Sequence, residues 1–507
     1  MINLTTYLRN PKIYLIIIAM LFVLHSLHFS FVCDDAFISF RYAKNFINGH
    51  GLVWNIGERP VEGYTNFLWI IVISLFMKVG FEPVIVSKVL GIFFGLCCII
   101  LVYLFSELIF QRKSFLNLVA PAILACCGPF AAWSTGGLET QMFTFFILAA
   151  VTMYLYEIQN DKITSFSAVL FVLASLTRPE GILIFGVTCL HNFFYLLFSK
   201  RSPFCRKTII WFLTFIIIYG VYFYWRFNYY GFIFPNAYYA KTGGGVYQLF
   251  RGFRYLARFI LFYKWPLLIG LSLLTLLKPL RSSIIYLLML IISFSAYIVY
   301  IGGDFLGMFR FFVPILPLMA ILVQEGVIAL CQWLIRIIHP TFVKTSVITL
   351  CSFTFILILV KGLTFSFKGQ PYERILYHKR VTEGQSAKGR WLHRHASPDE
   401  SLAAFGIGAI SYYSELNTID RLGITDIHIA HTKMHHMGKG LPGHEKRNFS
   451  YVLMKKPNYL SGPVVFPKRS KYKPTNKEIK RFKQLYKPFY INEPNLKFSL
   501  YKLKEDQ

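Results

Sequence analysis

Residues 13–38 read IYLIIIAMLFVLHSLHFSFVCDDAFI, an apolar run that ends directly at two adjacent acids, Asp34 and Asp35. The apolar part, Ile13–Val32, is about the length that spans a bilayer. Two like charges at the end of a membrane helix repel each other, and the low dielectric of the nearby bilayer raises the free-energy cost of this repulsion. We therefore expect a membrane helix over this run, followed immediately by a site that needs a carboxylate.

The stretch after the two acids is polar and aromatic, and it is typical of an ordered loop rather than a linker. It carries Arg41, Tyr42, Trp54, Asn55, Glu58, Arg59, Glu62, Tyr64 and Asn66. We expect this first loop to form part of the site.

The composition indicates a polytopic α-helical membrane protein. The 507 residues are 55% hydrophobic and only 15% charged, whereas about a quarter of a soluble protein is charged. The formal net charge of +29 is explained by basic cytoplasmic loops and anionic lipid headgroups, so no nucleic-acid partner is expected. The nine cysteines show no CxxC spacing, which indicates packing residues rather than a zinc site or a disulfide framework.

Eleven membrane-spanning segments are expected, at 13–32, 84–110, 115–133, 142–157, 163–177, 181–198, 208–227, 257–277, 283–301, 311–335 and 345–365. Their alternation places the basic loops on one side, which the positive-inside rule makes cytoplasmic. The apolar run Phe67–Met77 is too short to span, and counting it as a span would break that pattern. We expect it to be a helix in the outer interface, within a first outer loop over 33–80.

With this topology, the unusual polar clusters all fall on the outer face. They are Asp34-Asp35, Thr135–Thr140, Thr177–Gly181, Pro235–Lys241 and Gly302–Phe305. Loops that share a face can converge on one site.

The polar residues 366–507 are expected to form one small extracytoplasmic α/β domain beside the transmembrane domain over 1–365. Ser401–Phe405 is predicted to be a strand that enters Gly406-Ile407-Gly408 and a short helix. Tyr451–Met454 and Val464–Phe466 are predicted to be further strands. The two-glycine turn is weak evidence for nucleotide binding, because the third glycine of the dinucleotide motif is missing.

Two kinds of side chain can carry chemistry on the outer face. Asp34 and Asp35 are candidates for a general base, because a second charge and the nearby bilayer raise proton affinity; the alternative is a pair of helix-end acids without a catalytic role. The basic residues are candidates for a phosphate site, since positive charge is needed where a phosphate leaves. They are Arg41, Arg59, Arg178, Lys241 and Arg310, each of which alone fits a snorkelling or capping residue.

Three further features can be interpreted either as parts of the site or as parts of the structural scaffold. Asp304 after Gly302-Gly303 either lines a cavity or caps the next helix, and Glu139 is either a site residue or a partner of the helix dipole. The histidines of the C-terminal part suggest a metal, but the glycines among them favour a solvated or acceptor-binding loop over a metal site. They are His428, His431, His435, His436 and His444.

Several of these motifs together resemble the bacterial GT-C glycosyltransferases, and within them the arabinofuranosyltransferase-like group. The first loop carries Asp34–Ala43, Asn48–Asn55 and Glu62–Trp69. The matches further along are Thr135–Thr140, Leu176–Gly181, Pro235–Lys241, Gly302–Phe305, Leu422–Asp426 and Pro442–Lys446.

The resemblance implies transfer of a sugar from a polyprenyl-phosphate donor to a cell-envelope glycan on the outer face of a bacterial inner membrane. It implies that Asp34 is the base and that Asp35 orients the acceptor or the loop. Basic residues would bind the donor phosphate, with a substrate cavity lined by Tyr64, Asn66, Glu139, Asn236, Asp304, Asp426 and His444. Some relatives bind a divalent metal and others use only basic residues, so metal dependence stays open, as does the sugar.

Two other classes of protein are alternatives to a glycosyltransferase. A transporter or flippase of a lipid-linked glycan would need charges and broken spans at mid-membrane depth, whereas the acids and glycines here lie at the ends of predicted spans. A scaffold whose outer domain binds glycan or a partner without chemistry would depend on residues 366–507 and not on Asp34.

Overall fold

The computed structural model describes residues 10–504 except 162–163, 263–264, 278–280, 338–355, 357–358, 364–365, 368, 436, 463–472 and 494–495. In this part of the chain, seven helices are long and apolar enough to cross a membrane. They are α2 (Pro11–Phe29), α5 (Pro83–Ile109), α8 (Thr140–Gln159), α10 (Glu180–Phe198), α11 (Arg206–Tyr230), α15 (Ser282–Ile301) and the continuous stretch of η3 (Arg310–Ile315) and α16 (Leu316–Ile337). The protein is therefore a multi-pass membrane protein.

Three predicted spans are shorter or broken in the structure. The segment 115–133 is divided into η1 (Phe115–Leu118), α6 (Val119–Ala125) and α7 (Gly128–Ala132), and α9 (Phe166–Thr177) is a short apolar helix. The segment 257–277 is divided between α13 (Gly245–Phe262), α14 (Trp265–Leu273) and η2 (Leu274–Leu277). Most of 345–365 lies outside the described residues. Eleven spans thus stay a prediction, while the helical membrane architecture is confirmed.

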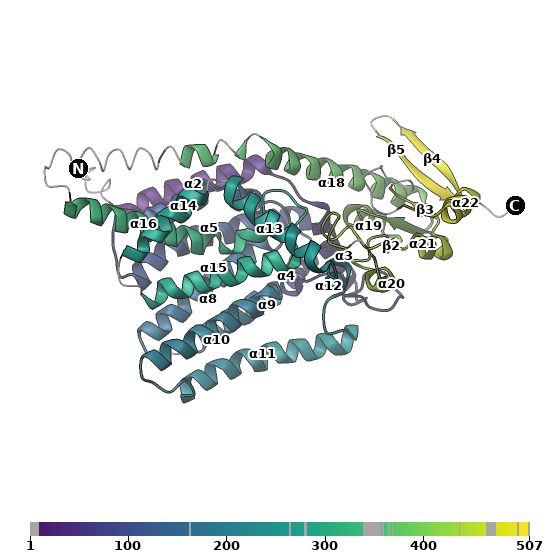
Figure 1. Ribbon diagram of the computed structural model, residues 1–507. Coiled ribbons are helices and arrows are strands. Elements are labelled where there is room, and N and C mark those ends of the chain that lie inside the picture. The colour runs from purple at the N-terminus through teal and green to yellow at the C-terminus, as the bar shows by residue number, and fades with distance from the viewer. Residues whose placement is uncertain are drawn as a thin grey trace.

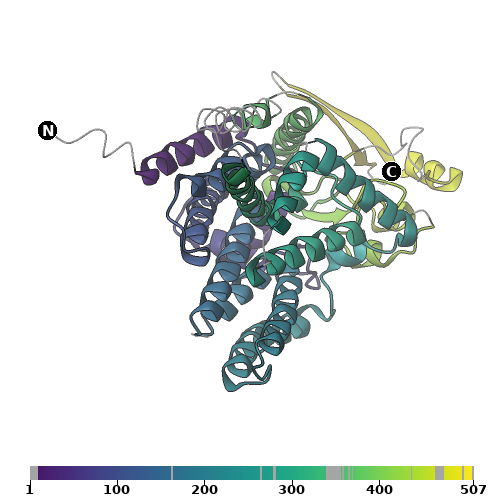
Figure 2. The ribbon, with the colours of Figure 1, turned by 60° about the vertical axis from the view of Figure 1, so that its left-hand side comes forward.

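The long helices lie roughly side by side, and a sheet domain adjoins one end of the bundle (Figure 1). We call this end the sheet end. It carries α3 (Asp34–Ile47) and α12 (Asn236–Lys241), which contact the sheet domain through α19 (Gly408–Ser414) and α20 (Ile427–His431). Figure 2 shows the same bundle turned, with α11 at its lower edge and the sheet domain still beside one end.

The opposite end of the bundle gathers basic residues, as the alternation of loops predicts. Arg112 and Arg281 both lie over the ring of Phe110, at the end of α5. Because α5 has 27 residues and a helix rises 1.5 Å per residue, this end is about 40 Å from the start of α5. The basic loops and the polar clusters are therefore separated along the bundle axis.

The predicted interfacial segment Phe67–Met77 is a helix, α4 (Phe67–Lys78). It buries Trp69, Ile70 and Ile73 and packs against α3 and α5. This packing holds the first loop against the bundle, whereas its place in the membrane interface stays a prediction.

The C-terminal part is α/β, as predicted. It comprises α18 (Gln370–His395), β1 (Ser401–Ala404), α19 (Gly408–Ser414), β2 (Asn417–Asp420), α20 (Ile427–His431), α21 (Phe449–Lys455), β3 (Tyr459–Leu460), α22 (Asn476–Leu485), β4 (Tyr486–Glu493) and β5 (Leu496–Leu503). The strand order is β2-β1-β3-β5-β4. β1 pairs in parallel with β2 and β3, and the other pairs are antiparallel.

The strand and short helix predicted around Gly406-Ile407-Gly408 are confirmed as β1 and α19. The strand predicted at Tyr451–Met454 is wrong, because this segment lies in α21. Asn448 caps that helix by accepting a hydrogen bond from the Tyr451 amide at 3.0 Å, and its buried apolar positions are spaced as on one helix face. The strand predicted at Val464–Phe466 lies outside the described residues.

Candidate functional site

A cavity of about 370 Å³ lies at the sheet end of the bundle. Its wall is largely apolar where α10, α11 and α15 line it, and it is charged toward α12 and the 302–305 loop. Its apolar and aromatic lining includes Ile182, Leu183, Tyr219, Tyr222, Phe223 and Ile301, and its charged lining comprises Glu62, Arg178, Glu180, Arg226, Lys241 and Asp304. An apolar pocket with a few convergent polar groups is the usual form of a ligand site.

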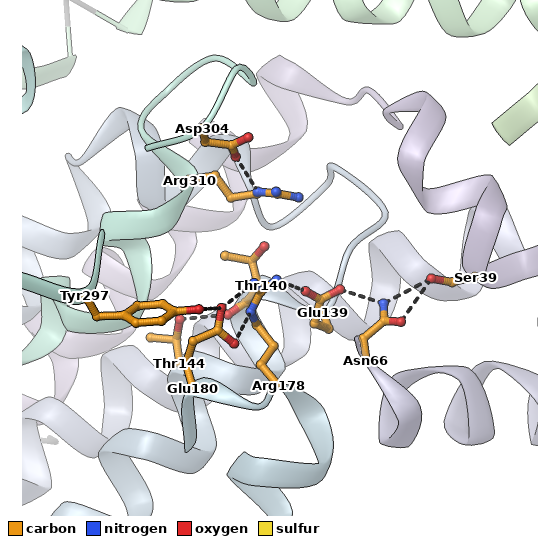
Figure 3. Close-up of polar contacts among 10 residues, drawn as sticks. All are labelled: Ser39, Asn66, Glu139, Thr140, Thr144, Arg178, Glu180, Tyr297, Asp304 and Arg310. Carbon is orange, nitrogen blue, oxygen red and sulfur yellow. Dashed lines mark hydrogen bonds and ion pairs between the residues drawn. The ribbon is translucent and has the colours of Figure 1, made fainter. Parts of the chain in front are cut away.

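Arg178 enters this cavity from the break between α9 and α10. Pro179 disfavours helical geometry at the residue before it, and Arg178 is accordingly extended, with φ −155°. Its guanidinium donates to Glu139 Oε1 at 2.6 Å and to both oxygens of Glu180 at 2.7 and 3.2 Å (Figure 3). Burial opposes the charge, but Glu180 and Glu139 hold the pKa of Arg178 above its ordinary value. Arg178 is therefore a permanent cation in a fixed position.

The same network continues to the first loop. Glu139 precedes α8 and accepts a second hydrogen bond, from Asn66 Nδ2 at 2.7 Å. Asn66 also contacts the Ser39 hydroxyl on α3, at 3.0 Å from Nδ2 (Figure 3). Two of the predicted site residues, Glu139 and Asn66, are thus brought together with Arg178, and the network joins α3 to the cavity wall.

Asp304 and Arg310 form a second fixed pair beside the cavity. Gly302 and Gly303 have φ of +84° and +75° and turn the chain after α15, a conformation that glycine adopts without strain. Asp304 accepts from the Phe305 amide at 2.8 Å and from Arg310 Nε at 2.8 Å. Asp304 therefore both shapes the tight loop and lines the cavity.

The two terminal nitrogens of Arg310 differ from its Nε in the contacts that they make. In the part of the chain that the structure describes, they make no hydrogen bond or ion pair, while the guanidinium lies over the rings of Trp133 and Phe311. The two rings and Asp304 fix the position of Arg310 and leave these nitrogens available to a ligand.

Lys241 is a third cation of this region, and its contacts differ from those of Arg178 and Arg310. It ends α12 and lines the cavity next to Gly443. Its ammonium makes no hydrogen bond or ion pair with any described residue. Burial lowers the pKa of Lys241, and the negative charges of Asp35 and Asp304 oppose that shift. Its charge is therefore held near two carboxylates without being paired to either.

Asp35 is a further acid, whose charge acts on Lys241 and Arg310. Among the described residues its carboxylate accepts no hydrogen bond and forms no ion pair. Its charge acts on Lys241 and also on His378 and His444. Burial lowers the pKa of both histidines, to about 4 for His378. The charge of Asp35 thus acts on Lys241, His378 and His444, while its own oxygens have no partner among the described residues.

Asp34, predicted to be the base, is hydrogen-bonded to the sheet domain. Its oxygens accept from the amides of Gly408 at 3.0 Å and Ala409 at 2.9 Å, at the start of α19. The first amides of a helix lack partners inside it, so a carboxylate satisfies them. Burial raises the pKa of Asp34 to about 6, and these two hydrogen bonds oppose the rise.

The two-glycine turn that suggested a nucleotide also serves this contact. A Cβ atom on Gly408 would lie 1.8 Å from the Asp34 carbonyl oxygen, so only glycine lets α3 and α19 approach this closely. Asp34 accepts from the Gly408 amide of this turn and from the next amide, that of Ala409, so the turn has a role in joining α3 to α19.

Arg41 and Arg59 were predicted to bind phosphate, but neither lines the cavity. The Arg41 guanidinium is buried and donates to the carbonyl oxygens of Trp54, Ser411 and Leu416 at 2.6–2.9 Å. Its donors are used to hold the first loop on the sheet domain. Arg59 is exposed over the ring of Phe232 and does not line the cavity.

Three residues predicted for the substrate cavity have contacts that support the fold. The Tyr64 hydroxyl lies 3.0 Å from that of Tyr230, and Asn236 Nδ2 donates to the carbonyl oxygens of Gly423 and Ile424. Asp426 caps α20 by accepting from the Ile429 amide at 2.9 Å. Among these cavity predictions in the C-terminal part, His444 is the one on which the charge of Asp35 acts.

No described group of three or more His, Cys, Asp or Glu side chains has the arrangement of a metal site. The histidines that suggested a metal are dispersed. His428 stacks on Tyr451, His431 packs on Tyr239, and His444 contacts the Phe305 ring. His436 lies outside the described residues.

The sequence reasoning missed Arg226, which pairs with Glu62 in the cavity wall at 2.5 and 2.9 Å. It interrupts the apolar helix α11, and a charge within a membrane segment generally has a partner or a function. That interruption is the signal that could have found it. Tyr297, whose hydroxyl donates to Glu180 at 3.2 Å, was also missed, since a tyrosine in an apolar helix carries no comparable signal.

Comparison with solved structures identifies the fold. ArnT from Cupriavidus metallidurans, solved bound to undecaprenyl phosphate, matches with a TM-score of 0.58 over 97% of each chain at 10% identity. The chain has the GT-C fold. The oligosaccharyltransferase of Archaeoglobus fulgidus in the apo form shares this GT-C architecture, with a TM-score of 0.50 and 10% identity, over 81% of this chain and 65% of that one.

Sequence comparisons add one local match to the GT-C assignment. Residues 373–498 match a family described as Domain of unknown function (DUF8728), which covers the α/β part of the chain. No curated protein matches the sequence.

Proposed function

We propose that this GT-C protein is a glycosyltransferase that moves a sugar from a polyprenyl-phosphate donor to a cell-envelope glycan. The observation that carries the proposal is the Lys241 ammonium in the wall of a largely apolar cavity, which has no ion-pair partner among the described residues and on which the charge of Asp35 acts. This combination suits a donor with a long apolar chain and a phosphate. The fold shared with ArnT, which was solved with undecaprenyl phosphate, agrees with it.

The donor phosphate is bound by Lys241 and by the terminal nitrogens of Arg310. Arg178 adds fixed positive charge in the cavity wall, although Glu139 and Glu180 already use its donors. Positive groups fixed in advance where negative charge develops are the largest catalytic contribution in many enzymes. The aromatic and aliphatic side chains of α10 and α11 that line the cavity accommodate the polyprenyl chain.

Asp35 is the general base in this proposal. Its carboxylate takes the proton from an acceptor hydroxyl while that oxygen attacks the anomeric carbon of the sugar. The bond between this carbon and the phosphate oxygen breaks, and the polyprenyl phosphate leaves with the electron pair. Asp34 keeps α3 in place by its bonds to α19, so the two roles expected from the sequence are exchanged.

The topology belongs to the same proposal. The sheet end of the bundle and residues 366–507 lie on the extracytoplasmic side of a bacterial inner membrane, and the basic opposite end lies in the cytoplasm. The basic loops that meet near Phe110 support this orientation through the positive-inside rule.

The test compares Asp35→Asn with Asp34→Asn in membranes that contain equal amounts of each protein. Labelled polyprenyl-phosphate sugars are supplied, and release of polyprenyl phosphate and labelled glycan is measured. We expect Asp35→Asn to lower the rate by about 10²–10⁴-fold, as for loss of a general base, and Asp34→Asn to retain most activity. Wild-type rates in Asp35→Asn would reject this base, and leaflet exchange of the lipid without sugar transfer would reject the enzyme.

A further inference from the structure

A second pocket lies where α3, α18 and α19 meet, separate from the cavity described above. Its volume is about 540 Å³, and its lining comprises Lys44, Arg390, His393, Arg394, Tyr412, Tyr413 and Glu415. It shares no lining residue with the cavity that holds Lys241. The proposed transfer of a sugar leaves this pocket without a role.

The α18 side of the pocket is basic. Arg390, His393 and Arg394 lie on one face of the helix, because residues three and four apart are neighbours. Two like charges at this spacing destabilise a helix. Among the described residues, neither arginine forms an ion pair, and the one side-chain hydrogen bond is from Arg394 Nε to the Arg390 carbonyl oxygen at 3.3 Å. The guanidinium donors are therefore available to an anion.

The opposite side of the pocket is aromatic and fixes the position of one arginine. The Arg390 guanidinium carbon lies 4.2 Å from the ring centroid of Tyr413 on α19. Lys44, in the last turn of α3, lies 5.4 Å from the ring centroid of Tyr412 and pairs with Glu415 at the rim. Both tyrosines are half-buried. The pocket thus combines an excess of positive charge with aromatic rings.

We propose that this pocket binds a sugar unit that carries a phosphate or a carboxylate, as a second attachment point for the glycan acceptor. Arginine forks bind both of these anions with paired hydrogen bonds, and the tyrosine rings offer apolar surface to the sugar ring. This proposal rests on the proposed function and names the acceptor as an acidic glycan.

The place of the pocket along α3 suits such an acceptor. Asp35 is in the first turn of α3 and Lys44 is in its last, so the two residues are about 14 Å apart along the helix axis and point to opposite sides of the helix. An acceptor chain of several sugars that passes around α3 can reach both. One of its hydroxyls then lies at Asp35 while a charged unit occupies the pocket.

The test measures binding rather than turnover, with the purified full-length protein in phosphatidylcholine nanodiscs. Glucose 1-phosphate, glucose and inorganic phosphate are compared by ligand-observed NMR. We expect glucose 1-phosphate to bind at least about tenfold more tightly than the other two. The double variant Arg390→Gln/Arg394→Gln is expected to weaken its binding about tenfold or more. Arg380→Gln, an exposed arginine of α18 outside the pocket, is the matched control and is expected to bind as wild type does.

Three results would overturn the proposal. The first is unchanged binding in the double variant, and the second is equal binding of inorganic phosphate and glucose 1-phosphate. The third is loss of glucose 1-phosphate binding when phosphatidylglycerol replaces phosphatidylcholine, which would assign the pocket to a lipid headgroup. Lys241→Met, which removes a proposed contact to the donor phosphate, is expected to keep the glucose 1-phosphate binding that depends on Arg390 and Arg394, so failure of the proposed function and failure of this pocket are distinguishable.

Discussion

Asp34 and Asp35 are neighbours in the sequence, yet they belong to two regions with opposite properties. Asp34 belongs to the joint, the contact of α3 and its loop with the sheet domain, where Arg41, Asn55 and Trp54 also make hydrogen bonds. Asp35 acts through its charge on Lys241 in the cavity wall, and neither its carboxylate nor the Lys241 ammonium has a partner among the described residues. In the joint, polar side chains stabilise the structure; in the cavity, polar side chains without partners can bind a ligand.

The largest loss of stability is expected when the joint loses Arg41. Arg41→Ala leaves buried carbonyl oxygens of the first loop and of α19 without their donor, which costs about 3 kcal/mol. We expect a marked fall in the thermal unfolding temperature and faster hydrogen exchange at residues 411–418. Arg59→Ala, which removes an exposed arginine of the same loop, is expected to change stability by less than about 0.5 kcal/mol. Equal effects of the two would show that the joint is not stabilised by Arg41.

Lys241→Met is expected to have the opposite profile, with an unchanged unfolding temperature and impaired donor binding. The proposed loss of a charge-assisted contact to the donor phosphate is worth about 2 kcal/mol, or a rise in KM of about thirtyfold. The KM for the polyprenyl-phosphate sugar measures it, with Lys433→Met, an exposed lysine outside the cavity, as control. A fall in stability without a change in KM would place Lys241 in the scaffold.

The smallest effect is expected at Asp34 and depends on pH. Because burial raises the pKa of Asp34 to about 6 from 3.8, the folded protein binds its proton more tightly than the unfolded chain does. This contribution to stability is present below pH 4 and is lost as the pH rises through 6.

Asp34→Asn removes that titration and keeps one acceptor for α19. As the pH rises from 4 to 7, the unfolding temperature of wild type is therefore expected to fall relative to that of this variant. A shift in the other direction would show that the hydrogen bonds of the joint outweigh burial.

Much of the architecture could be predicted from the pattern of residues. Long apolar runs, the two acids after the first of them, and the clusters around Arg178, Lys241 and Asp304 indicated a membrane bundle with polar residues at one end. Hydrophobic length and charge report directly on the solvent around each segment, so these predictions do not depend on tertiary contacts. The broken helix at 115–133 and the helix α21 were missed, because a short apolar run fits several local structures.

The sequence by itself determined that the protein spans a membrane and that its acids and basic residues gather at the ends of helices. Only the tertiary structure decided which of these groups are free. Consecutive residues of a helix point about 100° apart, so Asp34 contacts α19 while the charge of Asp35 acts on Lys241. Whether a charged side chain stabilises the fold or can bind a ligand depends on partners hundreds of residues away, as for Arg41 and Ser411.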